Sequence, residues 1–323
     1  MSLKQVIKEW MLPIAMLTGA SVYLIYHFMP HPVHRIGPFL EGVVSFLQPL
    51  LIFSMLFLTF CRIEPRDLKP HRWHWWLLLI QGGLFTLLGL GASAMLKWMP
   101  DADNWLVLIE CAMLCLIAPT ATAAAVVTRK LGGDVPGITT YVILINLLNA
   151  GLIPLIVPMI QPMSELSFWM AFSMILAKVF PLLILPCLAA WMVRYMFPRL
   201  YRKLVRYPDL PFYIWAVALA VAIAVSTKYL MASSLSMTML LMMSLISLLC
   251  CAFQFAAGRF IGGLYDKGQS CTKVTAGQAM GQKNTIFVIW LAYTFMTPET
   301  AIVGGLYSIW HNIYNSRQLR RSA

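Results

Sequence analysis

Charged residues are scarce in this sequence of 323 residues. Asp, Glu, Lys and Arg together make up 11% of it, whereas an ordinary globular domain contains about 25%. Hydrophobic residues make up 60%, and the mean hydropathy is +0.76. This balance excludes a water-soluble protein and predicts an integral membrane protein, with the lipid bilayer as its solvent.

Acidic residues are the scarcest charged kind, because 12 Asp and Glu stand against 24 Lys and Arg, for a formal net charge of +12. A basic protein can bind the phosphates of a nucleic acid. Here, however, the basic residues form short clusters between apolar runs, which is the pattern that sets the orientation of a membrane protein. We therefore predict no nucleic-acid partner.

The sequence also lacks the residue clusters of an enzyme or a metal site. Its seven cysteines have neither CxxC spacing nor histidine partners, so they are typical of small packing residues. Asp101 and Asp103 stand close together but have no histidine nearby, and no nucleophile is paired with a base. We expect no cofactor and no metal, and an intramembrane enzyme is a less favoured alternative.

Long apolar runs are what the sequence has instead. Runs of about 20 residues match the thickness of a bilayer and predict an all-α protein with ten transmembrane helices. The first run is too long for a signal-peptide core, so we expect it to be retained. The ten ranges are 11–29, 36–61, 73–96, 105–130, 135–160, 167–193, 210–230, 236–260, 274–296 and 300–316.

The distribution of basic residues orients these spans. With the N-terminus in the cytoplasm, 19 Lys and Arg fall on inner segments and three on outer segments. Cytoplasmic loops are enriched in Lys and Arg. The pattern therefore predicts a multi-pass protein of the plasma (cytoplasmic) membrane with both termini in the cytoplasm.

Two of the ten spans contain helix breakers near the middle of the membrane. Pro119, in "APTAT" (118–122), lacks an N–H and clashes with the carbonyl four residues earlier. In the ninth span, Gly277, Gly281 and the polar residues up to Asn284 have the same effect. Each broken span is the fourth of five, which predicts two five-helix inverted repeats whose broken helices meet, with half-helix N-termini aimed at an anionic substrate.

A second pairing favours the repeat. Gln81 lies in the third span and Gln254 in the eighth, and each is an amide next to small residues. The alternative is ordinary helix packing with one interhelical hydrogen bond.

The stretches "APTATAAAVVTRKLGGD" (118–134), "VPGITTYVILINLLNAGLIPLI" after it and "GQKN" (281–284) together resemble the bile acid:sodium symporter family. The resemblance implies a panel domain, 1–61 with 167–230, beside a core domain, 62–166 with 231–323. It also implies crossing fourth and ninth helices and alternating-access transport of a small or amphipathic organic anion, with sodium bound in the core.

The family's motif residues fall on positions of this chain unevenly. The breaker proline matches Pro119, the threonine at the substrate end matches Thr122, the terminal asparagine matches Asn284, and a sodium-binding glutamine matches Gln81. These matches and their neighbours are the site candidates that the resemblance implies. For the substrate they are Pro119, Thr120, Thr122, Gln282 and Asn284, and for ion coupling they are Lys283, Gln81 and Gln278.

The departures from the family pattern remove oxygen ligands. Where the resemblance implies a Ser-Asn pair for one sodium, this chain has Ala124-Ala125, and the hydroxyl positions of the fifth span are Ile138 and Val142. The resemblance implies a glutamate shared by both sodium sites, and this chain has Ala279 at that position. Where the resemblance implies a glutamine, this chain has Lys283. Because sodium binds several oxygen atoms, these changes cast doubt on sodium as the coupling ion.

Lys283 is a cation in a lipid span, which costs roughly 3 kcal/mol on insertion scales. Our leading hypothesis is that its ammonium permanently occupies one sodium position. Two further hypotheses are proton coupling, in which the buried amine alternates between charged and neutral forms, and direct neutralisation of the substrate. The alternative without a functional role is a side chain that snorkels to the cytoplasmic face.

Four other polar residues inside the spans are secondary candidates, together with Gln254. Glu110 is either a proton site or a residue facing an outer aqueous vestibule. Lys178 either neutralises Glu110 or faces the cavity. Asn146 and Asn149 supply either neutral oxygens to the site or helix-packing hydrogen bonds.

The sequence thus favours a secondary transporter of a small organic anion, bile-acid-like or a short carboxylate. A non-transporting membrane receptor is the alternative from another class. The substrate, the coupling ion and the oligomeric state are not indicated.

Overall fold

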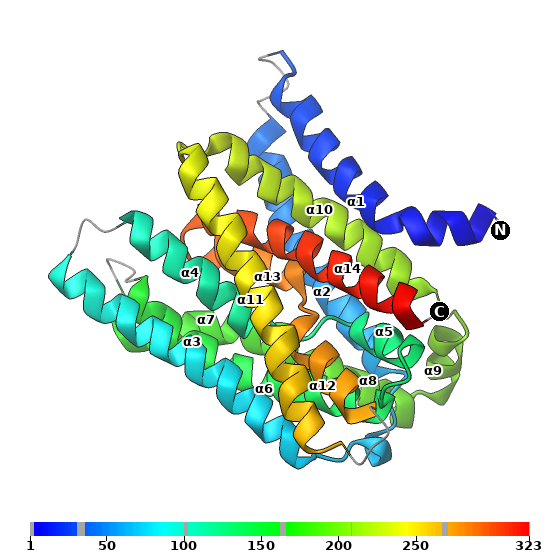
Figure 1. Ribbon diagram of the computed structural model, residues 1–323. Coiled ribbons are helices and arrows are strands. Elements are labelled where there is room, and N and C mark those ends of the chain that lie inside the picture. Colours follow the sequence, from blue (N-terminus) through cyan, green and yellow to red (C-terminus); the bar gives the residue numbers. More distant parts are fainter. Residues whose placement is uncertain are drawn as a thin grey trace.

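The computed structural model describes residues 3–30, 36–99, 103–161, 166–207, 209–266 and 271–322, and α-helices make up nearly all of these segments (Figure 1). The prediction of an all-α protein is therefore confirmed. In the first half of the chain the helices are α1 (Leu3–His27), α2 (Gly37–Phe60), α3 (Arg72–Trp98), α4 (Asp103–Ile117), α5 (Ala124–Lys130) and α6 (Val135–Ile160), with the short 3-10 helix η2 (Pro65–Asp67) before α3.

The second half contains α-helices of 8 to 28 residues. They are α7 (Phe168–Leu183), α8 (Leu185–Met196), α9 (Pro198–Val205), α10 (Leu210–Ala232), α11 (Met237–Leu264), α12 (Cys271–Gly281), α13 (Thr285–Phe295) and α14 (Ala301–Ser322), with the 3-10 helix η3 (Pro298–Thr300) before α14.

Seven helical segments of the described chain are long and apolar enough to cross a membrane, one of them being α7 and α8 taken together. Their outer faces expose large apolar side chains, such as Leu17 of α1 (68% exposed), Leu87 of α3 (67%) and Leu241 of α11 (64%). A soluble protein rarely exposes so much contiguous apolar surface, so these faces are suited to lipid. A multi-pass membrane protein follows.

Two predicted spans are each divided into two helices, as the breakers indicated. Residues 118–123 separate α4 from α5, and residues 282–284 separate α12 from α13. One detail of the prediction is wrong: Gly277 lies inside α12. It allows close packing instead, since a Cβ built there would lie 2.6 Å from Cγ of Arg259.

The sixth predicted span is also divided, which the sequence analysis did not anticipate. α7 ends at Leu183 and α8 begins at Leu185, with Pro186 in its first turn. The proline ring has no N–H to donate and crowds the carbonyl four residues earlier, so it interrupts the helical hydrogen bonds at this point.

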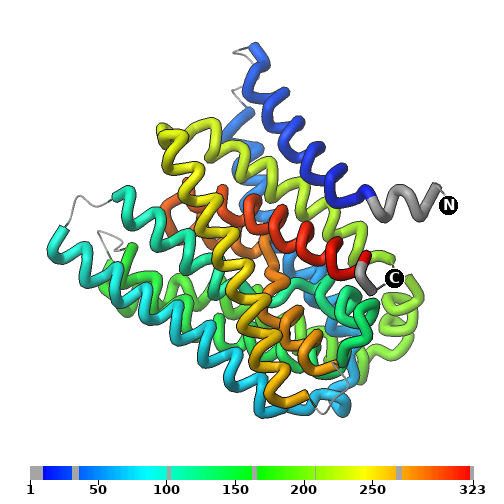
Figure 2. The backbone as a smooth tube through the Cα atoms, viewed as in Figure 1, coloured from blue at the N-terminus to red at the C-terminus, as the bar shows by residue number. Residues whose placement is uncertain are grey.

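The helices pack in two groups. In one group, α1 packs on α10, and α10 and α8 pack on α2. Figure 2 shows α1 and α10 side by side although they are far apart in the sequence. In the other group, α11 packs on α12, α4 and α14, while α3 packs on α6 and α4. α10 also packs on α13 and α14, so the two groups meet at these helices.

Candidate functional site

The two breaks meet at one point, called here the crossing (residues 118–123 and 282–284). The backbone N–H of Asn284 donates to the carbonyl of Pro119 over 2.8 Å, and that of Ala121 donates to the carbonyl of Gln282 over 2.8 Å. Thr120 and Lys283 thereby form an antiparallel bridge. Non-helical backbone at membrane depth must find hydrogen bonds within the protein, and each break supplies them to the other.

Side chains complete the helix ends at the crossing. The Thr120 hydroxyl donates to the Ala279 carbonyl (2.6 Å), and the Tyr307 hydroxyl donates to the Gly281 carbonyl (2.8 Å). Both bonds satisfy carbonyls that the end of α12 leaves open. Asn284 caps the start of α13, because its Oδ1 accepts from the backbone N–H of Phe287 over 3.2 Å.

The Lys283 ammonium lies inside the protein at the C-terminal end of α4. It donates to the carbonyl oxygens of Ala118 (2.9 Å) and Leu116 (3.1 Å), and the residue is 1% exposed. The snorkelling alternative is therefore wrong. The end of a helix carries open carbonyls and the negative pole of the helix dipole, both of which stabilise a cation.

Three amide side chains satisfy the neighbouring carbonyls of α4. Gln254 donates to Cys115 O (3.1 Å), Gln81 to Leu116 O (2.8 Å) and Asn149 to Ile117 O (2.7 Å). The carbonyls of residues 115–118, to which these amides and Lys283 donate, are called here the carbonyl cradle.

Gln81 and Gln254, paired by the sequence analysis, are in direct contact. Gln81 Nε2 donates to Gln254 Oε1 over 3.2 Å. Tyr141 donates to Gln81 Oε1, and Gln254 Nε2 donates to the Tyr307 hydroxyl over 3.0 Å. Both amides are thus bonded to protein partners at their nitrogen and oxygen atoms.

The position of the other implied sodium is apolar. Ala124, Ile138 and Ala279 are each 0% exposed and belong to one hydrophobic cluster with Leu77 and Met280. Val142 is buried in the adjoining cluster. The side chains at these positions therefore offer carbon where a sodium site needs oxygen.

Several buried polar atoms near the crossing have no hydrogen-bond partner among the described residues. They are Gln282 Oε1, Asn284 Nδ2, Asn149 Oδ1 and both side-chain polar atoms of Asn146. Buried polar atoms are normally satisfied, so these are candidates to bind water or a ligand. Thr122, in the link between α4 and α5, is half-buried.

Gln278 bonds away from the cradle. Its Nε2 donates to Asn315 Oδ1 (3.0 Å) and Gln318 Oε1 (3.1 Å) on α14. The structure therefore places Gln278 against α14, whereas the other two ion-coupling candidates, Gln81 and Lys283, share a carbonyl of α4.

Glu110 and Lys178 do not pair. Glu110 is 0% exposed, accepts from Gln161 Nε2 (2.6 Å) and from the Thr297 backbone N–H (3.0 Å), and so does not face an aqueous vestibule. Lys178 is exposed, with its ammonium 5.4 Å from the Phe295 ring centroid. In this chain Glu110 fastens the segment before η3 to α4 and α6.

Two tyrosines of the site were not identified from the sequence. Tyr141 holds Gln81, and Tyr307 joins Gln254 to Gly281. Tyrosine within a predicted span is usually interpreted as a residue of the membrane interface. A tyrosine with a buried hydroxyl is therefore easily overlooked. The available signal was that Tyr307 lies near the middle of its predicted helix (300–316), whereas Tyr141 is the seventh residue of its own (135–160). Among the described residues, no group of three His, Cys, Asp or Glu could hold a metal.

Comparison with known families bears on these observations. The model of the Sodium Bile acid symporter family matches residues 49–259. The chain belongs to this family. Members of the sodium bile acid symporter family are transporters, not enzymes. The match includes Gln81, Gln254 and the α4–α5 break, while Lys283 lies beyond it. A comparison with curated proteins finds no significant match.

Proposed function

We propose that this chain is a secondary active transporter of a small organic anion that works by alternating access without sodium as the driving ion. The observation that carries the proposal is the Lys283 ammonium in the carbonyl cradle. A cation held by backbone carbonyls at a helix C-terminus is what a coupling site of a divided-helix transporter provides. Here the cation is covalently part of the chain and cannot dissociate.

The apolar cluster supports the same conclusion for the other cation position. Sodium entering among Ala124, Ile138 and Ala279 would lose its water without gaining side-chain oxygen ligands. Its binding there would be strongly unfavourable. Neither position implied by the family resemblance is then suited to sodium.

The alternative role of Lys283 as a counter-charge for the substrate has less support. Its ammonium points to the end of α4, and the nearby titratable groups are the thiols of Cys115, Cys250 and Cys251. Proton coupling through the amine is the second candidate. Two observations favour it. The Lys283 side chain is buried, and the acceptors bonded to its amine among the described residues are backbone carbonyls and not a carboxylate.

For the substrate we propose the side of the crossing that carries Thr122, Gln282 and Asn284, together with the backbone at Pro119 and Thr120. Gln282 and Asn284 have unpaired buried polar atoms. α13 begins at Thr285 with Asn284 as its N-cap, and the partial positive charge of this helix end favours an anion. A bile-acid-like molecule or a short carboxylate fits this chemistry.

We also propose the ten-span architecture for this movement. The panel (1–61 and 167–230) would move against the core (62–166 and 231–323), and both termini would lie in the cytoplasm. The direct bond between Gln81 and Gln254, and the bridge between the two breaks, support the two inverted five-helix repeats because each joins residues in corresponding spans.

Uptake into proteoliposomes tests the proposal. Labelled taurocholate and labelled pantoate would be offered in sodium medium and in potassium medium. We expect the parent protein to take up one of them at initial rates equal within about twofold in the two media. Strict dependence on sodium would contradict the proposal. Saturable binding without net uptake would instead favour the receptor alternative.

A further inference from the structure

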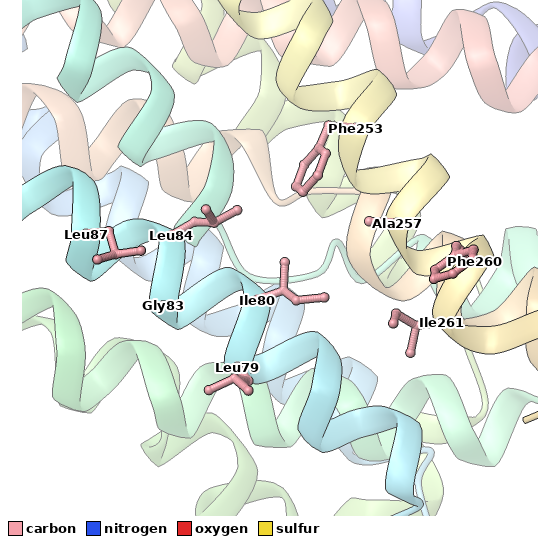
Figure 3. Close-up of a pocket in the computed structure, with 9 residues that line it drawn as sticks. All are labelled: Leu79, Ile80, Gly83, Leu84, Leu87, Phe253, Ala257, Phe260 and Ile261. Carbon is pink, nitrogen blue, oxygen red and sulfur yellow. The ribbon is translucent and has the colours of Figure 1, made fainter. Parts of the chain in front are cut away.

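An apolar groove lies between α3 and α11 (Figure 3). Its volume is about 540 Å³, within the range of ligand pockets, and every residue lining it is apolar. Its rims are exposed, with Leu79 at 63% and Leu87 at 67% on α3 and Phe260 at 66% on α11. The groove therefore opens on a surface suited to lipid.

The groove stays open because its lining includes two small residues, Gly83 on α3 and Ala257 on α11. A Cβ built on Gly83 would meet no atom within 4 Å. From Leu79 to Leu87 the helix rises about 12 Å, at 1.5 Å per residue. This is most of the depth of one leaflet, roughly half of the ~30 Å hydrocarbon layer.

One end of the groove carries polar groups suited to a lipid headgroup. Trp76 Nε1 donates to the Tyr265 hydroxyl over 2.8 Å and so joins α3 to α11. Arg72, Trp76, Leu79, Gly83 and Leu87 follow one another at intervals of three or four residues, which places them on one face of α3. Arg72 is exposed at the start of this face.

We propose that the groove binds one acyl chain of a membrane phospholipid whose phosphate pairs with Arg72. The order along α3 is a guanidinium, an aromatic residue and then an apolar channel. This is the order of phosphate, ester region and acyl chain in a phospholipid. Arginine is well suited to phosphate in both charge and geometry.

A second copy of the chain fits the groove less well. A two-fold interface sets the same surface against itself. An axis through the groove would therefore place the groove of one copy opposite the groove of the other and leave both unfilled. The groove and two of the amides that donate to the cradle share α3 and α11, because Gln81 follows the groove residue Ile80 in sequence and Gln254 follows Phe253. A bound chain therefore supports the two helices that carry these amides.

Native mass spectrometry of the detergent-solubilised protein, titrated with dioleoylphosphatidylglycerol, tests the site. Gly83→Leu fills the groove. Gly91→Leu is its matched control, since Gly91 is also a glycine of α3 with no atom within 4 Å of its built Cβ, but it does not line the groove. We expect Gly83→Leu to weaken binding of the first lipid at least tenfold and Gly91→Leu to leave it unchanged.

Arg72→Gln is expected to weaken binding of the first lipid severalfold, whereas Arg66→Gln, which removes an exposed arginine of η2, leaves it unchanged. Thermal unfolding identifies any variant that fails to fold, and Ala257→Leu then fills the groove from α11. Equal lipid binding by the groove-filling variants and the parent overturns the proposal. So does a parent dimer that the groove-filling variants dissociate, since the occupant is then a second copy.

Discussion

At the scale of single residues, the molecule depends on how its few buried charges are placed. Lys283 and Lys178 both lie within predicted spans, but their surroundings differ. Lys283 is fully enclosed and donates to two carbonyls, whereas Lys178 is exposed beside an aromatic ring. A hydrogen bond to a charged group contributes about 1.5–3 kcal/mol, and the helix dipole adds up to about 2 kcal/mol. Together these offset the insertion cost of roughly 3 kcal/mol.

Lys283→Met is expected to lower the free energy of unfolding by about 1–3 kcal/mol. Leu116 O keeps its bond from Gln81, but Ala118 O loses the bond from Lys283 in a buried place. Thermal unfolding in detergent measures the change. Lys178→Met is the control and should change stability by less than about 0.5 kcal/mol. Equal effects of the two substitutions would show that the cradle does not stabilise the fold through this ammonium.

At the scale of elements, the two broken helices satisfy each other's backbone hydrogen bonds at the crossing. Pro119 and Lys283–Asn284 interrupt two spans, and the interrupted backbones then bond to each other. This arrangement explains why polar side chains are concentrated there. It also gives Asn284 two roles that can be separated, because its Oδ1 caps α13 while its Nδ2 has no partner among the described residues.

Asn284→Asp and Asn284→Ala separate these roles. Asn284→Asp keeps the cap, so the free energy of unfolding of this variant should stay near that of the parent. Asn284→Ala should lower the free energy of unfolding by about 1 kcal/mol. Aspartate also sets a negative charge where we place the anionic substrate, so uptake should fall at least tenfold. Thermal unfolding and proteoliposome uptake measure the two effects. Normal uptake by Asn284→Asp would show that the substrate does not bind at the N-terminus of α13.

At the scale of the whole molecule, much of the fold could be predicted because the bilayer imposes strong rules on apolar runs. Helices lie in all ten predicted ranges, and both breaks were expected from proline, glycine and polar residues. The sequence analysis matched Gln81 with Gln254 as counterparts in the two halves without predicting a contact, and the two side chains form a direct hydrogen bond. The α7–α8 division was missed because proline within an apolar run does not show whether neighbouring packing restores the helix.

The site was only partly predictable, because side-chain direction depends on tertiary packing. The sequence placed Lys283 in a span but left its partner open between water, substrate and carbonyls. Gln278 was grouped with it and instead bonds to α14, and Tyr141 and Tyr307 were not identified. Sequence spacing alone does not fix which buried donor reaches which carbonyl.

The central claim is that the Lys283 ammonium occupies a cation position. The most direct test is to measure the unfolding temperature as a function of sodium concentration. A bound ion raises the unfolding temperature as its concentration exceeds its dissociation constant. In lithium-free buffers of constant ionic strength, with potassium exchanged for sodium, the parent protein should show no shift. Lys283→Gln, which vacates the position and supplies an amide oxygen, should gain a rise of a few degrees. A sodium-dependent rise in the parent protein would contradict the account.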